Sequence, residues 1–184
     1  FDIDYVTHEL GHQLGANHTF SHDLEGTGVN MEPGSGSTIM GYAGITGATT
    51  DVQSNSDPYF HFASINQIQS NLISTTCDVE TAIANNPPTI TALANYTIPK
   101  STAFVLTASA TDPWEQADDA SVSISNANLG NTTSGASFRS LTGTSNPTRY
   151  FPKLSAVLAG NLKNLSDWEA VSTVARVSNF KVTV

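Results

Sequence analysis

The chain has 184 residues, a formal net charge of −9 and only 12% charged side chains. All seven Lys and Arg residues lie from Lys100 onward, so residues 1–86 carry ten acidic and no basic side chains. Such a segment repels nucleic acid and anionic lipid, and no apolar run reaches transmembrane length, so we expect neither a nucleic-acid partner nor a membrane span. Cys77 is the only cysteine, which excludes an intrachain disulfide.

The first predicted element is a helix that begins within the first few residues. Asp2 or Asp4 is placed to supply its N-cap oxygen. Gly15 is expected to end it, because glycine tolerates the left-handed backbone that a helix C-terminus commonly needs. Apolar residues recur at three- and four-residue spacing and predict that one face of this helix is buried: Ile3, Val6, Leu10 and Leu14.

Residues 8–18 read H-E-L-G-H-Q-L-G-A-N-H. His8 and His12 are four residues apart, so on a helix they share a face and can both reach one ion at roughly 2.0–2.1 Å. After Gly15 the chain turns and brings His18 back as a third ligand. Three ligands leave a fourth position for water, as in catalytic zinc sites. Glu9 lies beside the metal face, where it can contact that water.

Residues 38–42 read T-I-M-G-Y, with Met40 twenty-two residues after His18. Together with the histidine motif, this run resembles the metzincin metallopeptidases. The longer runs at residues 17–20 and 32–44 are most similar to bacterial reprolysin-like (adamalysin-related) secreted metallopeptidases. The resemblance is strong over residues 1–72 and weaker beyond them.

The resemblance implies roles for further residues. Met40 would form a hydrophobic floor beneath the zinc ligands. Tyr42 would be a fifth zinc ligand that moves away and stabilises the oxyanion when substrate binds, with packing in the turn as an equally weighted alternative. Thr19 departs from the aspartate that adamalysins proper usually place after the third histidine. The pappalysin branch also tolerates threonine there and is the nearest rival within the clan.

The function that the resemblance implies is a secreted zinc-dependent endopeptidase, with Zn²⁺ as cofactor and protein or peptide substrates. Zinc would polarise the scissile carbonyl and acidify its bound water, and Glu9 would take the proton from that water and pass it to the leaving amine. One alternative is a non-catalytic zinc-containing secreted binding or adhesion protein, which would not need Glu9. Another is a zinc hydrolase acting on a different bond, against which His18 and Met40 argue. The oligomeric state is left open.

Two histidines lie outside this motif. His22 is in a polar stretch with Asp23 and Glu25, where a solvated loop is favoured over a second metal site. His61 is in an aromatic segment that leads into a helix, where packing or capping is favoured over metal binding. Three carboxylates are possible calcium ligands without the regular spacing of an EF-hand: Glu32, Asp51 and Asp57.

Residues 64–73 form the next predicted helix. Ser64 and Gln67 make a capping box, and Ile65, Ile68 and Leu72 form one apolar face. Residues 1–86 thus supply the zinc helix, the methionine turn and a final helix of an α+β metzincin lower subdomain, mostly helical and incomplete. Two helices bury too little surface for an independent core, so we expect the natural protein to continue N-terminally.

Paired prolines at positions 87 and 88 predict an extended connector and a domain boundary. Over residues 87–184 the apolar pattern changes to period two, which favours an all-β immunoglobulin-like or fibronectin-like sandwich over another small antiparallel fold. Trp114 is the candidate buried aromatic, and residues 154–158 are a covering loop or short helix. Strands are expected at residues 103–109, residues 121–125 and the C-terminal run with Phe180, Val182 and Val184.

Overall fold

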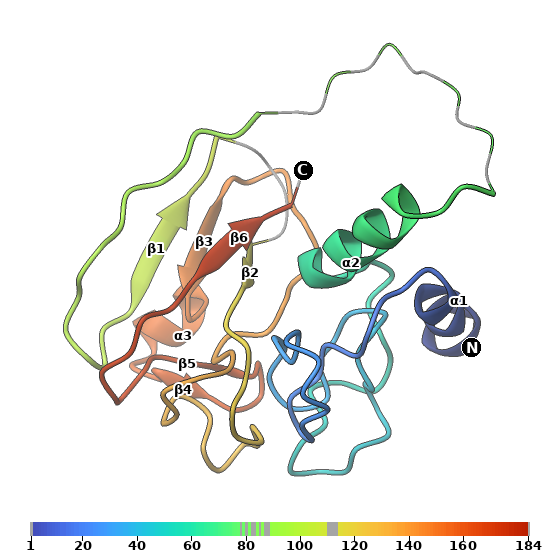
Figure 1. Cartoon of the computed structure of the whole chain (residues 1–184). Coiled ribbons are helices and arrows are strands. Elements are labelled where there is room, and N and C mark those ends of the chain that lie inside the picture. Colours follow the sequence, from blue (N-terminus) through green and yellow to red (C-terminus); the bar gives the residue numbers. More distant parts are fainter. Residues whose placement is uncertain are drawn as a thin grey trace.

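The computed structural model describes residues 2–77, 79, 81, 84, 86, 89–109 and 114–183. Much of the expected connector (Asn85, Pro87 and Pro88) and the last residue of the expected C-terminal strand, Val184, lie outside the described residues. Helices α1 and α2 lie on one side of the molecule and the strands on the other (Figure 1). No described helix combines the length and apolarity needed to cross a membrane.

The N-terminal helix has two parts, the π-helix η1 (Asp2–Thr7) and α1 (His8–Gln13). The expectation that its apolar stripe is buried is wrong, because Val6 and Leu10 are about half exposed, at 49% and 50%. The expected N-cap is also wrong, since Asp2 and Asp4 lie within η1 and the Asp4 carboxylate accepts a 2.6 Å bond from the Ser56 amide. The buried face of α1 instead consists of His8 and Gly11.

Residues 14–61 connect α1 to α2 through turns and bends, with an isolated bridge between Phe20 and Glu32. A small core lies between these segments, made of Ala16, Ile39 and Met40. Phe60 and Ile68 pack against it from the approach to α2 and from α2 itself. The loop after α1 and the loop before α2 therefore share one core.

Helix α2 (Phe62–Ile73) begins two residues before the predicted start. Its N-cap is His61, whose Nδ1 accepts a 3.3 Å bond from the Ala63 amide, so the expected capping role of His61 is confirmed. The expected capping box is wrong, because the Gln67 side chain accepts a bond from the Asn17 amide at 2.9 Å instead. Helix α2 is thereby tied to the segment that leads to His18.

The part expected to be all-β is rich in strands, and among the described residues these form three separate two-stranded antiparallel sheets with no closed sandwich. Strand β1 pairs with β3, β2 with β6 and β4 with β5 (Figure 1). The short helix α3 (Leu154–Leu158) follows β3, as expected for residues 154–158. The strands are β1 (Phe104–Thr107), β2 (Trp114–Gln116), β3 (Thr148–Phe151), β4 (Lys163–Asn164), β5 (Glu169–Ala170) and β6 (Phe180–Val182).

The period-two pattern predicted strands in three segments, and strands form within two of them. In β1, Phe104 and Leu106 face the same apolar cluster as Trp114, which is buried as expected, while Val105 between them is exposed. Strand β6 forms within the C-terminal run. The strand expected at residues 121–125 is wrong, since this segment has no ladder and Ile124 donates its amide to the Ser21 carbonyl at 2.7 Å.

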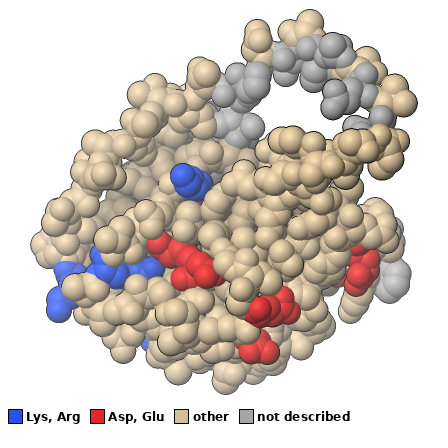
Figure 2. All heavy atoms as spheres, viewed as in Figure 1, with Lys and Arg blue, Asp and Glu red and all other residues tan. Residues whose placement is uncertain are grey.

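Contacts join the N-terminal part to the β-rich part. Val52 lies in one apolar core with Ile124 and Trp168. The Glu115 carboxylate on β2 accepts the Phe62 amide at the start of α2, at 2.8 Å. On the face shown in Figure 2, Lys and Arg lie over the strand-bearing part, and acidic side chains lie both beside them and on the side that carries α1. The loops around the histidine motif thus rest on the strand-bearing part.

Candidate metal centre

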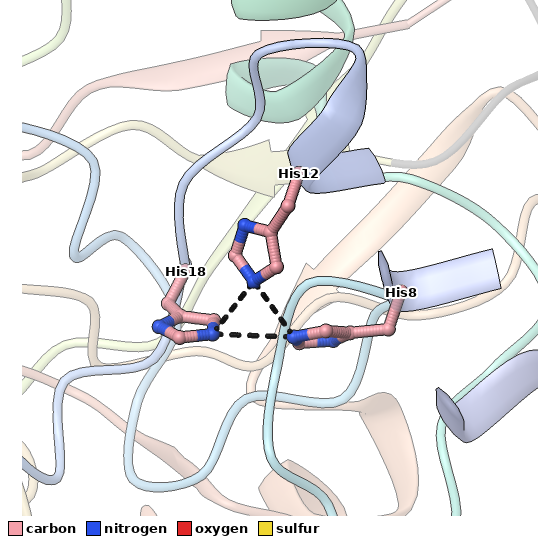
Figure 3. A group of neighbouring side chains, drawn as sticks. All are labelled: His8, His12 and His18. Carbon is pink, nitrogen blue, oxygen red and sulfur yellow. Dashed lines mark hydrogen bonds between the residues drawn. The ribbon is translucent and has the colours of Figure 1, made fainter. Parts of the chain in front are cut away.

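The structure brings the Nε2 atoms of His8, His12 and His18 to one point (Figure 3). His12 Nε2 lies 3.1 Å from that of His8 and 3.0 Å from that of His18, and the His8–His18 distance is 3.2 Å. His8 and His12 come from successive turns of α1, and His18 follows the turn at Gly15, which has φ of +101°. Among the described residues, these three form the one group able to hold a metal ion.

The other ring nitrogen of each histidine faces an oxygen that can only accept. His8 Nδ1 lies 2.7 Å from the Ile39 carbonyl, His12 Nδ1 lies 2.8 Å from the Ala16 carbonyl, and His18 Nδ1 lies 2.8 Å from Oε1 of Glu25. Each Nδ1 must therefore carry the proton and donate it. A neutral imidazole has one proton, so all three Nε2 atoms present lone pairs to one another.

Three converging lone pairs repel one another unless a cation lies between them, so this donor set fits a divalent metal. Nitrogens that share a tetrahedral zinc ion at its usual bond length lie about 3.3 Å apart, close to the observed spacings. Burial lowers the pKa of His8, and the neighbouring His12 and His18 lower it further, although the bond to Ile39 opposes them. The neutral imidazole that a metal requires is thus favoured at His8.

The turn that returns His18 is held by α2. The Asn71 side-chain amide donates to the Leu14 carbonyl at 2.9 Å, and the Gln67 side chain accepts the Asn17 amide. A Cβ atom on Gly15 would lie 2.8 Å from Cβ of Asn71, so this position needs glycine for space as well as for its backbone angle.

Met40 packs against α1 at Gly11 and is fully buried. Its neighbour Ile39 supplies the carbonyl that accepts from His8. Gly11, between His8 and His12 on the buried face of α1, leaves the space that the Met40 side chain occupies. The methionine turn therefore supports the helix through both side-chain packing and a bond to a ligand.

Tyr42 and Glu9 flank the three histidines. The ring centroid of Tyr42 is 4.5 Å from that of His18 and 5.6 Å from that of His8. Burial raises the pKa of Tyr42, and the charges of Glu25 and Glu9 raise it further, so its hydroxyl keeps its proton at neutral pH. Glu9 is exposed on α1 directly after His8.

Glu32 has a structural role that the sequence did not indicate. It is almost fully buried, and its carboxylate accepts from the hydroxyls of Thr19 and Thr38 at 2.6 and 2.5 Å and from the Ser37 amide at 2.9 Å. These bonds join the residue after His18 to the loop before Met40.

The expected calcium ligands are not brought together. The Glu32 carboxylate accepts the bonds described above. The Asp51 carboxylate accepts from the Thr46 and Gly47 amides at 2.9 Å each, and Asp57 forms an ion pair with Arg139 at 3.4 Å. These three carboxylates are each occupied by protein donors at separate places. The structure therefore gives no calcium site at these positions.

His22 does not lie in a fully solvated loop. Its ring packs on Phe20, with centroids 4.4 Å apart, and burial lowers its pKa despite the nearby carboxylates of Asp23, Asp51 and Glu25. It is not one of the residues that could hold the metal ion. His22 thus extends an aromatic cluster that begins at His18 and Tyr42.

The comparisons with known proteins agree with this geometry. No curated protein and no solved structure matches the chain significantly. A family model matches residues 1–85, the part that contains the three histidines, Glu9, Met40 and Tyr42, and its description is Metallo-peptidase family M12B Reprolysin-like. This match supports the reprolysin-like family, and a hydrolase acting on peptide bonds, for residues 1–85 of the chain.

Proposed function

We propose that this protein is a zinc-dependent endopeptidase that cleaves protein substrates with His8, His12 and His18 as the zinc ligands. The observation that carries the proposal is the convergence of three Nε2 lone pairs within 3.0–3.2 Å, each with its Nδ1 proton held by an acceptor. Lone pairs that converge this closely repel one another unless a cation lies between them. The reprolysin-like match over residues 1–85 supports peptidase chemistry.

Zinc bound to these histidines would polarise the scissile carbonyl and make the attacking water more acidic. Glu9 is the general base in this proposal, because it is exposed, follows a ligand directly and lies on the same helix. Its carboxylate takes the proton of the attacking water and delivers it to the nitrogen of the leaving amine.

Tyr42 is the proposed donor to the oxyanion that develops on the scissile carbonyl. Its ring lies beside His8 and His18, and burial keeps its hydroxyl protonated by raising its pKa. Tyr42→Phe would preserve the packing against Phe20 and remove the donor alone. We expect it to lower kcat by about tenfold to a thousandfold with little change in KM.

The proposed substrates are proteins or peptides, and the proposed setting is extracellular, as in the secreted enzymes that the chain resembles. Residues 1–86 have no basic side chain to attract an anionic polymer. Peptides without a strong negative charge are the substrates that this part of the surface favours.

The test measures zinc content and chelator-sensitive cleavage of casein and of a peptide without net negative charge, by the full chain and by Glu9→Gln. We expect stoichiometric zinc in both proteins and a loss of about 10²- to 10⁴-fold in turnover for the variant. The matched control is Asp23→Asn, which removes a carboxylate from a nearby loop and should keep activity. Zinc binding without cleavage would instead indicate a non-catalytic binding protein, and near-normal turnover of Glu9→Gln would remove Glu9 from the mechanism.

A further inference from the structure

The three histidines differ in what holds their Nδ1 protons. His8 and His12 donate to backbone carbonyls, of Ile39 and Ala16. His18 donates to a side chain, the carboxylate of Glu25, at 2.8 Å. The third ligand is thus the one whose support depends on the identity of a side chain.

Stacking alone does not orient the His18 ring. The His18 ring stacks on the Phe20 ring, with centroids 4.8 Å apart. The Tyr42 ring is in an edge-on arrangement with the His18 ring, with centroids 4.5 Å apart. Stacking fixes the plane of the ring, but it does not distinguish two orientations that differ by half a turn about the bond from Cβ to the ring. It also does not select which nitrogen carries the proton. The bond from Nδ1 to Glu25 does both, because it requires Nδ1 on the Glu25 side and a proton on that nitrogen.

We propose that Glu25 is a positioning residue that orients His18 and fixes its tautomer, so that the affinity of the site for zinc depends on this carboxylate. This inference rests on the proposed zinc site. A carboxylate that accepts from a ligating imidazole also makes the metal-facing nitrogen a stronger donor. Glu25 is not itself one of the residues grouped around the metal position.

The location of Glu25 makes the effect separable from folding. Its side chain is 36% exposed, whereas that of His18 is 13% exposed. It lies between Leu24 and Gly26 in an exposed segment without regular secondary structure and belongs to none of the three apolar cores. Its removal should therefore leave the metal-free fold intact.

The experiment compares the full chain with Glu25→Ala, Glu25→Gln and Asp23→Asn. Asp23 is two residues away and accepts from the Leu24 amide, so its variant removes one charge from the same loop without touching a ligand. The zinc Kd is measured by competition with a chromophoric chelator. The melting temperature is measured with and without zinc.

We expect Glu25→Ala to raise the zinc Kd by about tenfold to a hundredfold, and Glu25→Gln, which keeps an acceptor oxygen, to raise it less. Asp23→Asn should stay within about twofold of the wild type, because a solvated charge is strongly screened. The metal-free melting temperature should be the same in all four proteins, and the rise on adding zinc should be smallest for Glu25→Ala. A purely structural role would instead lower the metal-free value.

Two results would overturn the inference. One is a zinc Kd for Glu25→Ala within about twofold of the wild type. The other is an equal loss of zinc affinity in Asp23→Asn, which would show that any negative charge in this loop has the same effect. Either result leaves the peptidase proposal standing if the wild type binds zinc and cleaves casein. Conversely, zinc binding that depends on Glu25 in a protein without peptidase activity would refute only the proposed function. A wild type that binds no zinc would refute both.

Discussion

The Thr19 hydroxyl donates a 2.6 Å hydrogen bond to the buried Glu32 carboxylate. The backbones of the same two residues are also joined, since the Glu32 amide donates to the Thr19 carbonyl at 2.8 Å. Thr19 directly follows the third histidine, and its amide donates to the Met40 carbonyl at 3.1 Å. The ligand-bearing segment, the buried carboxylate and the methionine turn are therefore linked through one residue.

This link predicts that Thr19→Val destabilises the protein although valine has nearly the same shape. The change removes one of the two hydroxyl groups that donate to Oε2 of the buried Glu32 carboxylate, and losing a hydrogen bond to a buried charged group costs about 1–3 kcal/mol. Urea denaturation at neutral pH measures the loss. Thr19→Ser is the matched control, because it keeps the hydroxyl and should lose less than Thr19→Val. Equal stability of the two variants would show that the hydroxyl does not support Glu32.

The second prediction concerns Gly11, which packs against the methionine turn. A Cβ atom there would lie 3.0 Å from Cε1 of Phe60 and 3.4 Å from Cε of Met40, and closer still to the Met40 sulfur. We expect Gly11→Ala to cost about 1–3 kcal/mol, because overpacking a buried side chain outweighs the gain in helix propensity of about 1 kcal/mol.

A double-mutant cycle with Met40→Ala tests the cause of this loss. With Met40 shortened, Gly11→Ala should cost less or become stabilising, because the helix propensity then acts without the overlap. Denaturation of the four proteins gives the coupling energy between the two positions. A cost for Gly11→Ala that is independent of Met40 would place the strain elsewhere.

The convergence of the three histidines is the feature that the sequence predicts best, because it depends on local geometry. His8 and His12 are placed by one helical turn, and His18 is returned by a turn that needs the positive φ of Gly15. Periodicity predicted that Val6 and Leu10 share a helix face, but not what covers that face, and both are about half exposed. A spacing pattern reports which residues point the same way, and burial depends on the rest of the fold.

Features that depend on distant residues were missed. The predicted partner of Ser64 in a capping box, Gln67, is used by the Asn17 amide, which lies 50 positions away in the sequence. The expected strand at residues 121–125 is replaced by a bond from Ile124 to Ser21. The sequence does not indicate that Glu25 bonds to His18 or that Glu32 bonds to Thr19, because these pairs are recognised only once the loops are placed.

The third prediction is a dependence of stability on pH through Asp51. Burial alone would raise the pKa of this carboxyl, but bonds from Thr46 and Gly47 outweigh burial and lower its pKa below the ordinary value of 3.8. The ionised form is therefore the one that the fold stabilises. Its contribution is present above the ordinary pKa and is lost as the pH falls through the lowered value.

Asp51→Asn should accordingly reduce the unfolding free energy by about 1 kcal/mol at neutral pH, because the charge-assisted bonds are weakened. The difference from the wild type should shrink between neutral pH and a pH below the lowered pKa of Asp51, where the carboxyl itself becomes neutral. Thermal denaturation at the two pH values measures this change. A difference that stays the same at both would contradict the role of the ionised carboxyl.

The last prediction concerns a buried ion pair in the β-rich part. Arg149 contacts Glu169 at 2.7 Å, with only 10% and 1% of the two side chains exposed, and Glu169 also accepts the Lys153 amide. Burial lowers the pKa of Arg149, and the charge of Glu169 opposes this shift. Glu169→Gln leaves the guanidinium buried without a counter-charge, and we expect a loss of about 3–5 kcal/mol in urea denaturation.

The matched control is Asp167→Asn, which breaks an ion pair with Lys153 at 2.5 Å whose side chains are 30% and 48% exposed. Water screens that pair, and the amide that replaces the carboxylate keeps an acceptor oxygen for the Asn164 side chain, so the change should cost less than about 1 kcal/mol. The two substitutions remove the same charge from positions two residues apart, so they differ mainly in burial. If both cost the same, burial would not explain the stability of the Arg149 pair. A much larger loss for Glu169→Gln would show that this pair holds β3 against β5.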